Sequence, residues 1–139
     1  MSAAAGDAPQ GPPAVTVTRR IEFSDVDPSG RYHYSTALRL LEAAEVELLD
    51  RLGLLDEAYT SMPRAHVEFD YLAALRLRDV VEVTLTVAAV GRTSVTFACE
   101  LRREGELCAT GRLVAVHVGE DGRPRPWAEE HRRRLEGAG

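Results

Sequence analysis

The chain has 139 residues, a length that suits one domain, and its 45% hydrophobic and 28% charged residues are ordinary for a soluble globular protein. A net charge of −5 argues against general nucleic-acid binding, which needs a basic face. All 17 basic residues are arginine, so a Schiff-base lysine is excluded, while guanidinium groups remain to grip a small phosphorylated ligand.

The two cysteines indicate the compartment. Cys99 and Cys108 fall within apolar strand patterns and lack CxxC spacing, so we interpret them as buried thiols in a reducing compartment, the cytoplasm. The N-terminus lacks a basic region followed by an apolar run, and no segment approaches the ~18 apolar residues of a membrane span. We therefore expect a cytoplasmic protein with no membrane segment.

The first half of the chain predicts a tail, a strand and a long helix. Residues 1–14 are rich in Ala, Gly and Pro and predict a flexible tail. Apolar and polar residues then alternate from Val15 to Ser24, which is typical of a half-buried strand. From Ser35 to Leu52 leucines and alanines recur every three or four residues, which predicts a helix buried on more than half of its girth and ended by Gly53.

The second half predicts four strands after a short turn or loop at residues 54–63. Their expected ranges are 65–71, 80–90, 95–103 and 107–118. Tight turns join the last three, so these strands must be antiparallel, and a single buried helix needs a sheet that curves around it. We predict an α+β hot-dog fold, a five-stranded antiparallel sheet wrapped around one long helix, over residues 15–119. Residues 120–139 are expected to form a C-terminal tail or short helix.

The segment between the first strand and the helix contains the strongest chemical signal. Asp25 and Asp27 lie on a Pro/Gly turn directly before the helix start. A helix N-terminus offers backbone N–H groups without intrahelical partners, and these can hold a carbonyl oxygen that becomes negative during reaction. A carboxylate beside that point suits acyl transfer or hydrolysis, whereas a simple turn would use the same residue types. Spacing alone leaves both interpretations open.

The sequence resembles the hot-dog-fold acyl-CoA thioesterases of the 4-hydroxybenzoyl-CoA thioesterase type. The resemblance covers about residues 17–118. Residues 23–30, FSDVDPSG, look like the family's aromatic-x-D-x-D-x-x-G signature, and Glu42 follows in the helix. Residues 69–73 with 79–83, and the turn at 91–95, are similar to the family's later strands. The sequence departs from many members at Arg31, His33 and Tyr34, so the resemblance does not give the acyl group.

The resemblance implies a mechanism and partners. Asp27 takes the position of the catalytic carboxylate, either attacking the thioester carbon or activating water, and the amide of Tyr34 holds the thioester oxygen. Arg92, Thr93 and Ser94 lie where relatives often contact coenzyme A. The substrate is an acyl-CoA or acyl-carrier-protein thioester, with no cofactor because coenzyme A is part of the substrate. The family also implies homodimers or homotetramers with sites at subunit interfaces, and an exposed sheet edge independently favours a homodimer.

Three further side chains have a functional and a structural interpretation. We expect Asp25 to stay structural, capping the turn through an Asx bond. His33 could orient substrate or water, although a surface histidine in a loop is the commoner case. Glu42 is expected to be partly buried and to need a partner, so it either supports water activation or only bonds a neighbouring group. No convincing metal site is predicted, since His66 and Glu68 lack a third ligand.

Other enzyme classes lack their residues. There is no G-x-S-x-G elbow, Walker loop or H-E-x-x-H motif. The alternatives that stay open are a non-catalytic binding module for acyl-CoA or acyl-carrier protein, and an acyl-carrier-protein thioesterase. A hot-dog dehydratase is disfavoured because its longer acid and histidine motif is not found.

Overall fold

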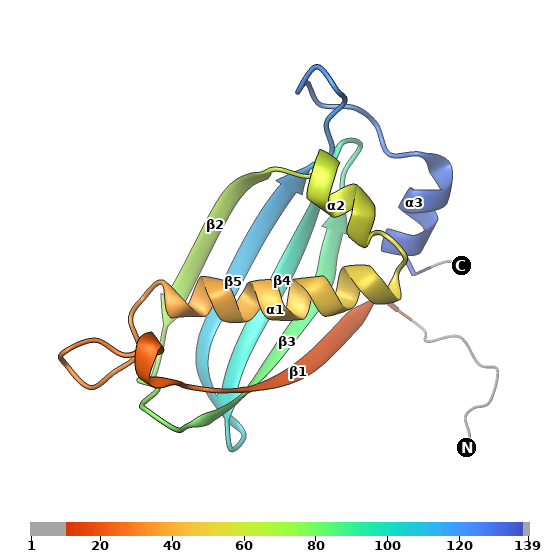
Figure 1. Cartoon of the computed structure of the whole chain (residues 1–139). Coiled ribbons are helices and arrows are strands. Elements are labelled where there is room, and N and C mark those ends of the chain that lie inside the picture. Colours follow the sequence, from red (N-terminus) through yellow and green to blue (C-terminus); the bar gives the residue numbers. More distant parts are fainter. Residues whose placement is uncertain (1–10, 138–139) are drawn as a thin grey trace, which may run out of the picture.

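The computed structural model describes residues 11–137, and its centre is one antiparallel sheet (Figure 1). The strand order across the sheet is β1-β3-β4-β5-β2. The strands are β1 Ala14–Arg20, β2 Arg64–Tyr71, β3 Val80–Val90, β4 Ser94–Arg103 and β5 Glu106–Val116. Residues 1–10 of the predicted tail lie outside the described residues, and Ala14 already belongs to β1.

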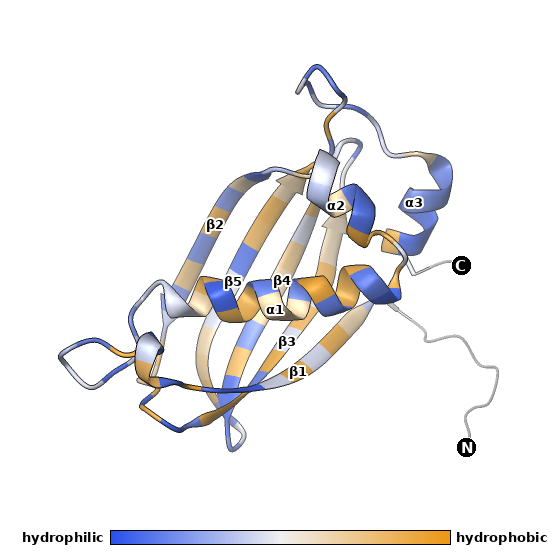
Figure 2. Cartoon of the chain, in the orientation of Figure 1, coloured by the Kyte–Doolittle hydropathy of each residue, from blue (hydrophilic) through white to orange (hydrophobic). Residues whose placement is uncertain are grey.

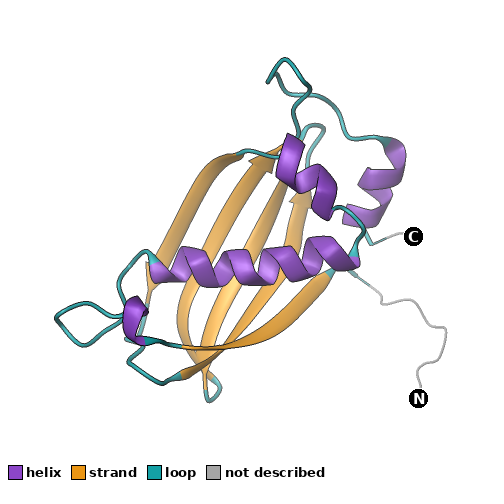
Figure 3. Ribbon diagram, in the orientation of Figure 1, coloured by secondary structure: helices purple, strands orange, loops and turns teal. Residues whose placement is uncertain are grey.

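The long helix α1, Thr36–Arg51, crosses one face of this sheet (Figure 3). Hydrophobic and hydrophilic residues alternate along α1 (Figure 2), and most of its apolar side chains are buried while most of its charged ones, apart from Glu45, are not. Gly53 follows the helix with φ +72°, a conformation that favours glycine and ends helices. The buried apolar residues of α1 are Ala37, Leu40, Leu41, Ala44, Leu48 and Leu49. The predicted helix and the α+β hot-dog fold are confirmed.

The predicted hairpin of β4 and β5 is confirmed as well. Glu104 and Gly105, the turn between them, both have positive φ values, +50° and +83°. Such turns match the right-handed twist of the strands that they connect. The apolar face of the neighbouring strand β3 is fully covered by the core, as the alternation predicted, at Val81, Val83, Leu85 and Val87.

The prediction for the end of the first strand is wrong. The strand stops at Arg20, and a 3-10 turn, η1 Phe23–Asp25, follows it. Ile21 is fully buried, but Phe23 is 82% exposed, so the alternation does not continue. The chain turns here because the Asp25 carboxylate accepts the backbone N–H of Glu22 and holds the segment in a tight turn.

The predicted loop at 54–63 is also wrong, because it contains helix α2, Leu55–Ser61. Leu54 and Met62, which flank the helix on either side, are buried in the core, and Ala58 within the helix is packed against it. Only seven residues are helical, too few for the pattern to stand out in the sequence.

The C-terminal part ends in helix α3, Glu129–Leu135, so of the two predicted alternatives the short helix is the one that forms. Trp127 and Leu135 are buried in the same core cluster as the sheet and α1. The thiols of Cys99 and Cys108 are free and buried as well. None of the helices within residues 11–137 has the length and apolarity needed to cross a bilayer.

Candidate active site

Asp25 forms the frame of the acidic loop. Its side chain is 3% exposed, and its carboxylate accepts the Glu22 N–H at 2.7 Å and pairs with Arg39 of α1. Its backbone carbonyl accepts the His33 N–H at 2.7 Å and the Thr36 hydroxyl at 3.0 Å. Asp25 therefore ties the end of β1, the loop and the start of α1 together. This role is structural, as expected, but Asp25 does not form the Asx turn that we predicted for it.

The Asx turn belongs to Asp27. One carboxylate oxygen, Oδ1, accepts the Ser29 N–H at 2.8 Å and also the Ser29 hydroxyl. These two hydrogen bonds, the hydroxyl's first, lower the pKa of Asp27 below its ordinary value. Asp27 is therefore ionised at neutral pH. Its second oxygen, Oδ2, has no hydrogen-bond partner within residues 11–137 and can act on another molecule.

The backbone amide of Tyr34 lies two residues before the first residue of α1. The amides on either side are engaged, since that of His33 donates to Asp25 O and that of Ser35 to His33 Nδ1 at 3.2 Å. For the Tyr34 N–H itself, the described part of the chain supplies no acceptor. A free amide next to a helix N-terminus suits a developing negative charge.

Asp27 and Tyr34 line the same open hollow of about 590 Å³. Besides Tyr34, two further tyrosines, Tyr32 and Tyr71, form part of its wall, and the Tyr71 hydroxyl donates to Tyr34 O at 2.6 Å. Burial raises the pKa of both Tyr32 and Tyr71, so these phenols stay protonated at neutral pH. The remaining wall comes from the loop and from the segment that follows β2: Ser29, Arg31, Leu72, Ala73, Ala74 and Arg76.

His33 lies beside the hollow without lining it. Its Nδ1 bonds the Ser35 hydroxyl at 2.7 Å, and its ring lies against that of Tyr34 with centroids 4.3 Å apart. These contacts fix the turn before α1. Within one chain His33 shapes the loop and makes no hydrogen bond to the Asp27 carboxylate, although its charge is one of the smaller causes of the lowered pKa of Asp27.

Glu42 is exposed, so the prediction of a partly buried Glu42 is wrong. The buried acid of α1 is Glu45, 1% exposed, which pairs with Arg64 of β2. Burial raises the pKa of Glu45, and Arg64 opposes that shift. Both acids line a groove of about 450 Å³ between α1 and α2, together with Arg64. The groove is separate from the Asp27 hollow.

Arg92, Thr93 and Ser94 form the β3–β4 turn at the other end of the sheet. Tyr71, in the wall of the Asp27 hollow, is paired with Ala109, whereas Ser94 is paired with Val116 on the same strand β5. These two positions on β5 are about 23 Å apart at the usual rise of a strand. One chain does not bring the predicted coenzyme A residues to Asp27.

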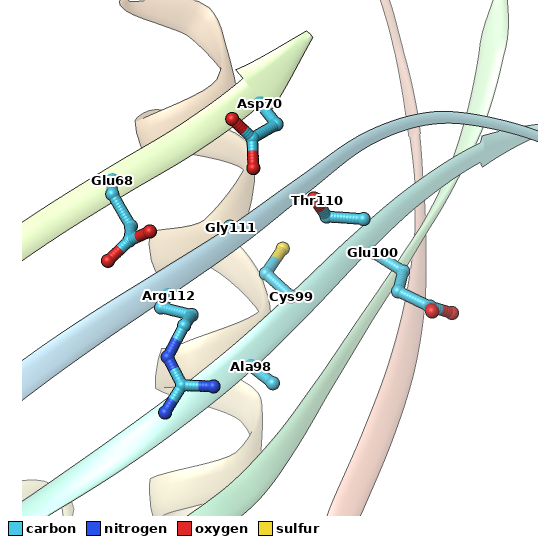
Figure 4. Close-up of a pocket in the computed structure, with 8 residues that line it drawn as sticks. All are labelled: Glu68, Asp70, Ala98, Cys99, Glu100, Thr110, Gly111 and Arg112. Carbon is cyan, nitrogen blue, oxygen red and sulfur yellow. The ribbon is translucent and has the colours of Figure 1, made fainter. Parts of the chain in front are cut away.

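A second hollow, about 270 Å³, lies on the sheet face opposite to α1 (Figure 4). Glu68 and Asp70 of β2 and Arg112 of β5 surround it. The nearest nucleophile, the Cys99 thiol, is buried, and burial raises its pKa to about 12, so it stays protonated. No group of three or more His, Cys, Asp or Glu that could hold a metal lies among residues 11–137. This second hollow therefore has no reactive group comparable to the Asp27 carboxylate.

Sequence reasoning missed Ser29 and Tyr71 as parts of the site. Ser29 was a readable signal, because a hydroxyl two residues after an aspartate is a common donor in such turns. Tyr71 was not, since its hydroxyl reaches Tyr34 across 37 positions of sequence. The Asp27 hollow therefore holds an ionised carboxylate and an unengaged backbone amide.

The chain is similar to a known protein family over most of its length. The profile of the thioesterase-like superfamily matches residues 21–135, which include the acidic loop, α1 and all strands after β1. No curated protein matches the chain.

Solved structures share the fold over most of both chains. A predicted thioesterase from Bacillus stearothermophilus is 28% identical, with a TM-score of 0.80 over 88% of this chain and 93% of its own. A thioesterase from Thermus thermophilus, complexed with coenzyme A and Zn, is 29% identical, with a TM-score of 0.82 over 91% and 93%. A hypothetical protein, also from Thermus thermophilus, is 30% identical, with a TM-score of 0.75 over 85% and 95%.

Proposed function

Because this chain belongs to the thioesterase-like superfamily, we propose that it hydrolyses an acyl-CoA thioester to a carboxylic acid and free coenzyme A. Asp27 acts as nucleophile or general base, and the Tyr34 amide stabilises the thioester oxygen. The enzyme needs no cofactor, since coenzyme A is part of the substrate. The narrower assignment to the 4-hydroxybenzoyl-CoA thioesterase type rests on the signature at residues 23–30 and belongs to the proposal.

The observation that carries the proposal is the pairing of two unused groups on one hollow. Asp27 keeps a carboxylate oxygen without a partner, and Tyr34 keeps a backbone N–H without one, within residues 11–137. In the reaction the Asp27 oxygen adds to the thioester carbon, or removes a proton from the water that adds to it. The charge that develops on the carbonyl oxygen then meets the Tyr34 N–H. The sulfur leaves with its electron pair as the coenzyme A thiolate, which takes up a proton from solvent. In the nucleophilic route, water then hydrolyses the anhydride between the acyl group and Asp27, which releases the carboxylic acid and restores the carboxylate.

The exposed edge strand supports a homodimer. Both faces of β2 are open along nearly its whole length, including the apolar Val67 and Tyr71. An unpaired edge of this kind is a template for a second strand, and a two-fold axis pairs β2 with its own copy in antiparallel fashion. The Tyr71 end of one β2 then lies beside the Arg64 end of the other.

This pairing would complete the site. The Tyr71 end carries the Asp27 hollow, and the Arg64 end carries the groove with Glu42. Ser94 lies near the Arg64 end as well, since Val95 and Arg64 are both paired with Ala115. We therefore place Glu42 and the turn of Arg92, Thr93 and Ser94 on the partner's side of each site. His33, beside the Asp27 hollow, is proposed to contact substrate at the same interface.

Thiol release from a panel of aromatic, short and long acyl-CoAs tests the function. Asp27→Asn keeps the size of the side chain but not its basicity, and we expect turnover to fall at least ~10²-fold. Asp50→Asn, an exposed acid on α1, is the matched control and should keep wild-type turnover. Normal thiol release from a folded Asp27→Asn protein would remove Asp27 from the catalytic role, whereas a wild-type protein that binds acyl-CoA and releases no thiol would favour a binding module. Release from acyl-carrier protein but not from acyl-CoA would identify the other class of thioester.

Light scattering or sedimentation tests the assembly. We expect a homodimer or homotetramer, and an active monomer near 15 kDa would contradict the interface described above. The two buried free thiols favour a reducing compartment, and on that ground we propose a cytoplasmic location.

A further inference from the structure

The β3–β4 turn is held by the C-terminal part of the chain. We use the name C-terminal clasp for residues 117–135. All four backbone carbonyls of the turn accept hydrogen bonds from it: Gly91 O from Arg132 Nη2 at 2.8 Å, Arg92 O from the Trp127 N–H at 3.3 Å, Thr93 O from the His117 N–H at 2.7 Å, and Ser94 O from Trp127 Nε1 at 3.1 Å. Apart from the clasp, the turn has its own bond from Gly91 N–H to Ser94 O at 2.8 Å.

The clasp is in turn anchored to the body of the protein. Leu135 is fully buried in the core, and Arg134 of α3 donates to Gly53 O at the end of α1 at 3.3 Å. The His117 ring stacks on Trp127, with centroids 4.8 Å apart, and its Nε2 lies 3.1 Å from the Glu57 carboxylate on α2. Through the clasp, the β3–β4 turn is therefore held in place relative to helices α1 and α2.

The side chains of the turn stay available while its carbonyls are occupied. Arg92 is exposed, and Thr93 is half-buried. A short turn that is bonded at every carbonyl loses little conformational entropy when its side chains take up a ligand. The clasp thus donates hydrogen bonds to the backbone of the turn and leaves the Arg92 guanidinium and the Thr93 hydroxyl free to bind a ligand.

We propose that Trp127 and Arg132 are positioning residues for substrate binding, which hold the β3–β4 turn in the conformation that meets the coenzyme A portion. This inference rests on the proposed function. The two residues act through Arg92, Thr93 and Ser94 and touch no reacting atom. Their loss weakens binding of the coenzyme A portion and leaves the chemistry at Asp27 unchanged.

The test compares two thioesters of the same acyl group. One carries coenzyme A, and the other carries N-acetylcysteamine, which lacks the nucleotide and all phosphates. Trp127→Phe removes the Nε1 donor but keeps an aromatic ring on His117, and Arg132→Met removes the guanidinium but keeps an apolar stem. Arg133→Met is the matched control, because Arg133 is exposed on the same helix, 4.0 Å from Glu129.

We expect KM for acyl-CoA to rise about three- to tenfold in Trp127→Phe and in Arg132→Met, the scale of one lost hydrogen bond. The kcat for acyl-CoA and the kcat/KM for the N-acetylcysteamine thioester should stay within about twofold, and Arg132→Lys, which keeps one charged donor, should restore part of the KM. Arg133→Met should match the wild type in every constant.

Wild-type KM values in both folded variants would overturn the inference and leave the thioesterase function intact. An equal loss on the two thioesters would also overturn it, because a merely structural effect makes no distinction between them. A wild-type protein that releases thiol from neither thioester would overturn the proposed function, and the inference would fall with it.

Discussion

The two ends of the sheet use their polar groups in opposite ways. At the Asp27 end, a carboxylate oxygen and the Tyr34 amide have no partner among the described residues, and the Tyr32 hydroxyl is buried without one. At the β3–β4 end every carbonyl of the turn is bonded. Buried atoms without a partner occur at both ends, at the Tyr32 hydroxyl and at His131 Nδ1 of the clasp. The contrast lies in the solvent-accessible Asp27 carboxylate and the Tyr34 amide, which are open to another molecule. The rigid end stabilises the fold and the open end is free for chemistry.

The largest effect should come from the Tyr34 amide. Tyr34→Pro removes the N–H, and we expect turnover to fall roughly 10²- to 10³-fold, about 2.7–4 kcal/mol in the activation free energy. Tyr34→Phe loses only the exposed hydroxyl and should stay within a few-fold.

Proline at 34 also pushes His33 toward extended dihedrals, so a thermal melt must accompany the kinetics of Tyr34→Pro. Equal damage in two folded variants would make the phenol, and not the backbone, the working group. That result would show that the free Tyr34 N–H has no role in catalysis, and the contrast with the fully bonded β3–β4 turn would then have no functional meaning.

Leu135→Ala tests the rigid end. It removes a fully buried side chain from α3, and we expect the free energy of unfolding to fall by about 2–4 kcal/mol, measured by urea denaturation. The kcat of the remaining folded protein should be close to wild type, because Asp27 lies at the other end of the sheet. A fall in kcat that matches the fall in stability would show that the two ends are coupled.

Asp25→Ala tests the frame of the open end. The change removes charged hydrogen bonds to the Glu22 N–H and to Arg39, and we expect a loss of about 2 kcal/mol in the free energy of unfolding. Asp27→Ala, two residues away, should cost almost no stability, because its carboxylate bonds only Ser29 in its own turn. Thermal melts of the two variants would refute this difference if they coincided.

The smallest effect concerns pH. The proposed mechanism needs the Asp27 carboxylate, so we expect activity above its pKa and a loss of activity as the pH falls through it. The Ser29 hydroxyl is the main cause of the lowered pKa. Ser29→Ala should therefore raise the pKa and move the acid limb of kcat/KM to higher pH, while the rate at neutral pH stays nearly unchanged. If the acid limb of kcat/KM does not move in Ser29→Ala, the ionisation of a group other than Asp27 must control it.

The sequence predicted the parts of the fold that have a clear period. Helix α1 and strand β3 showed their repeats of 3.6 and 2 directly. Helix α2 was missed because it is so short. The predicted continuation of β1 past Arg20 was wrong because the Glu22 N–H donates to the Asp25 carboxylate and the backbone turns there. These contacts override a local pattern that by itself favoured a strand.

The site was only partly predictable for the same reason. Asp27 and Tyr34 are close in sequence, and their place before α1 followed from the turn and the helix start. Which acid of α1 is buried could not be predicted, since Glu45 is buried against Arg64, a partner from β2. The separation of the β3–β4 turn from Asp27 depends on the strand order, which spacing along the chain does not define.

The buried cysteines have a practical consequence for colorimetry. Disulfide-exchange dyes react with accessible thiolates, whereas burial raises the pKa of Cys99 to about 12 and also raises that of Cys108. The native chain should therefore consume such a dye slowly, and coenzyme A set free in the same cuvette would dominate the early colour. Unfolding exposes both thiols. The amount of dye that reacts then measures the number of unfolded chains, because each unfolded chain offers two thiols.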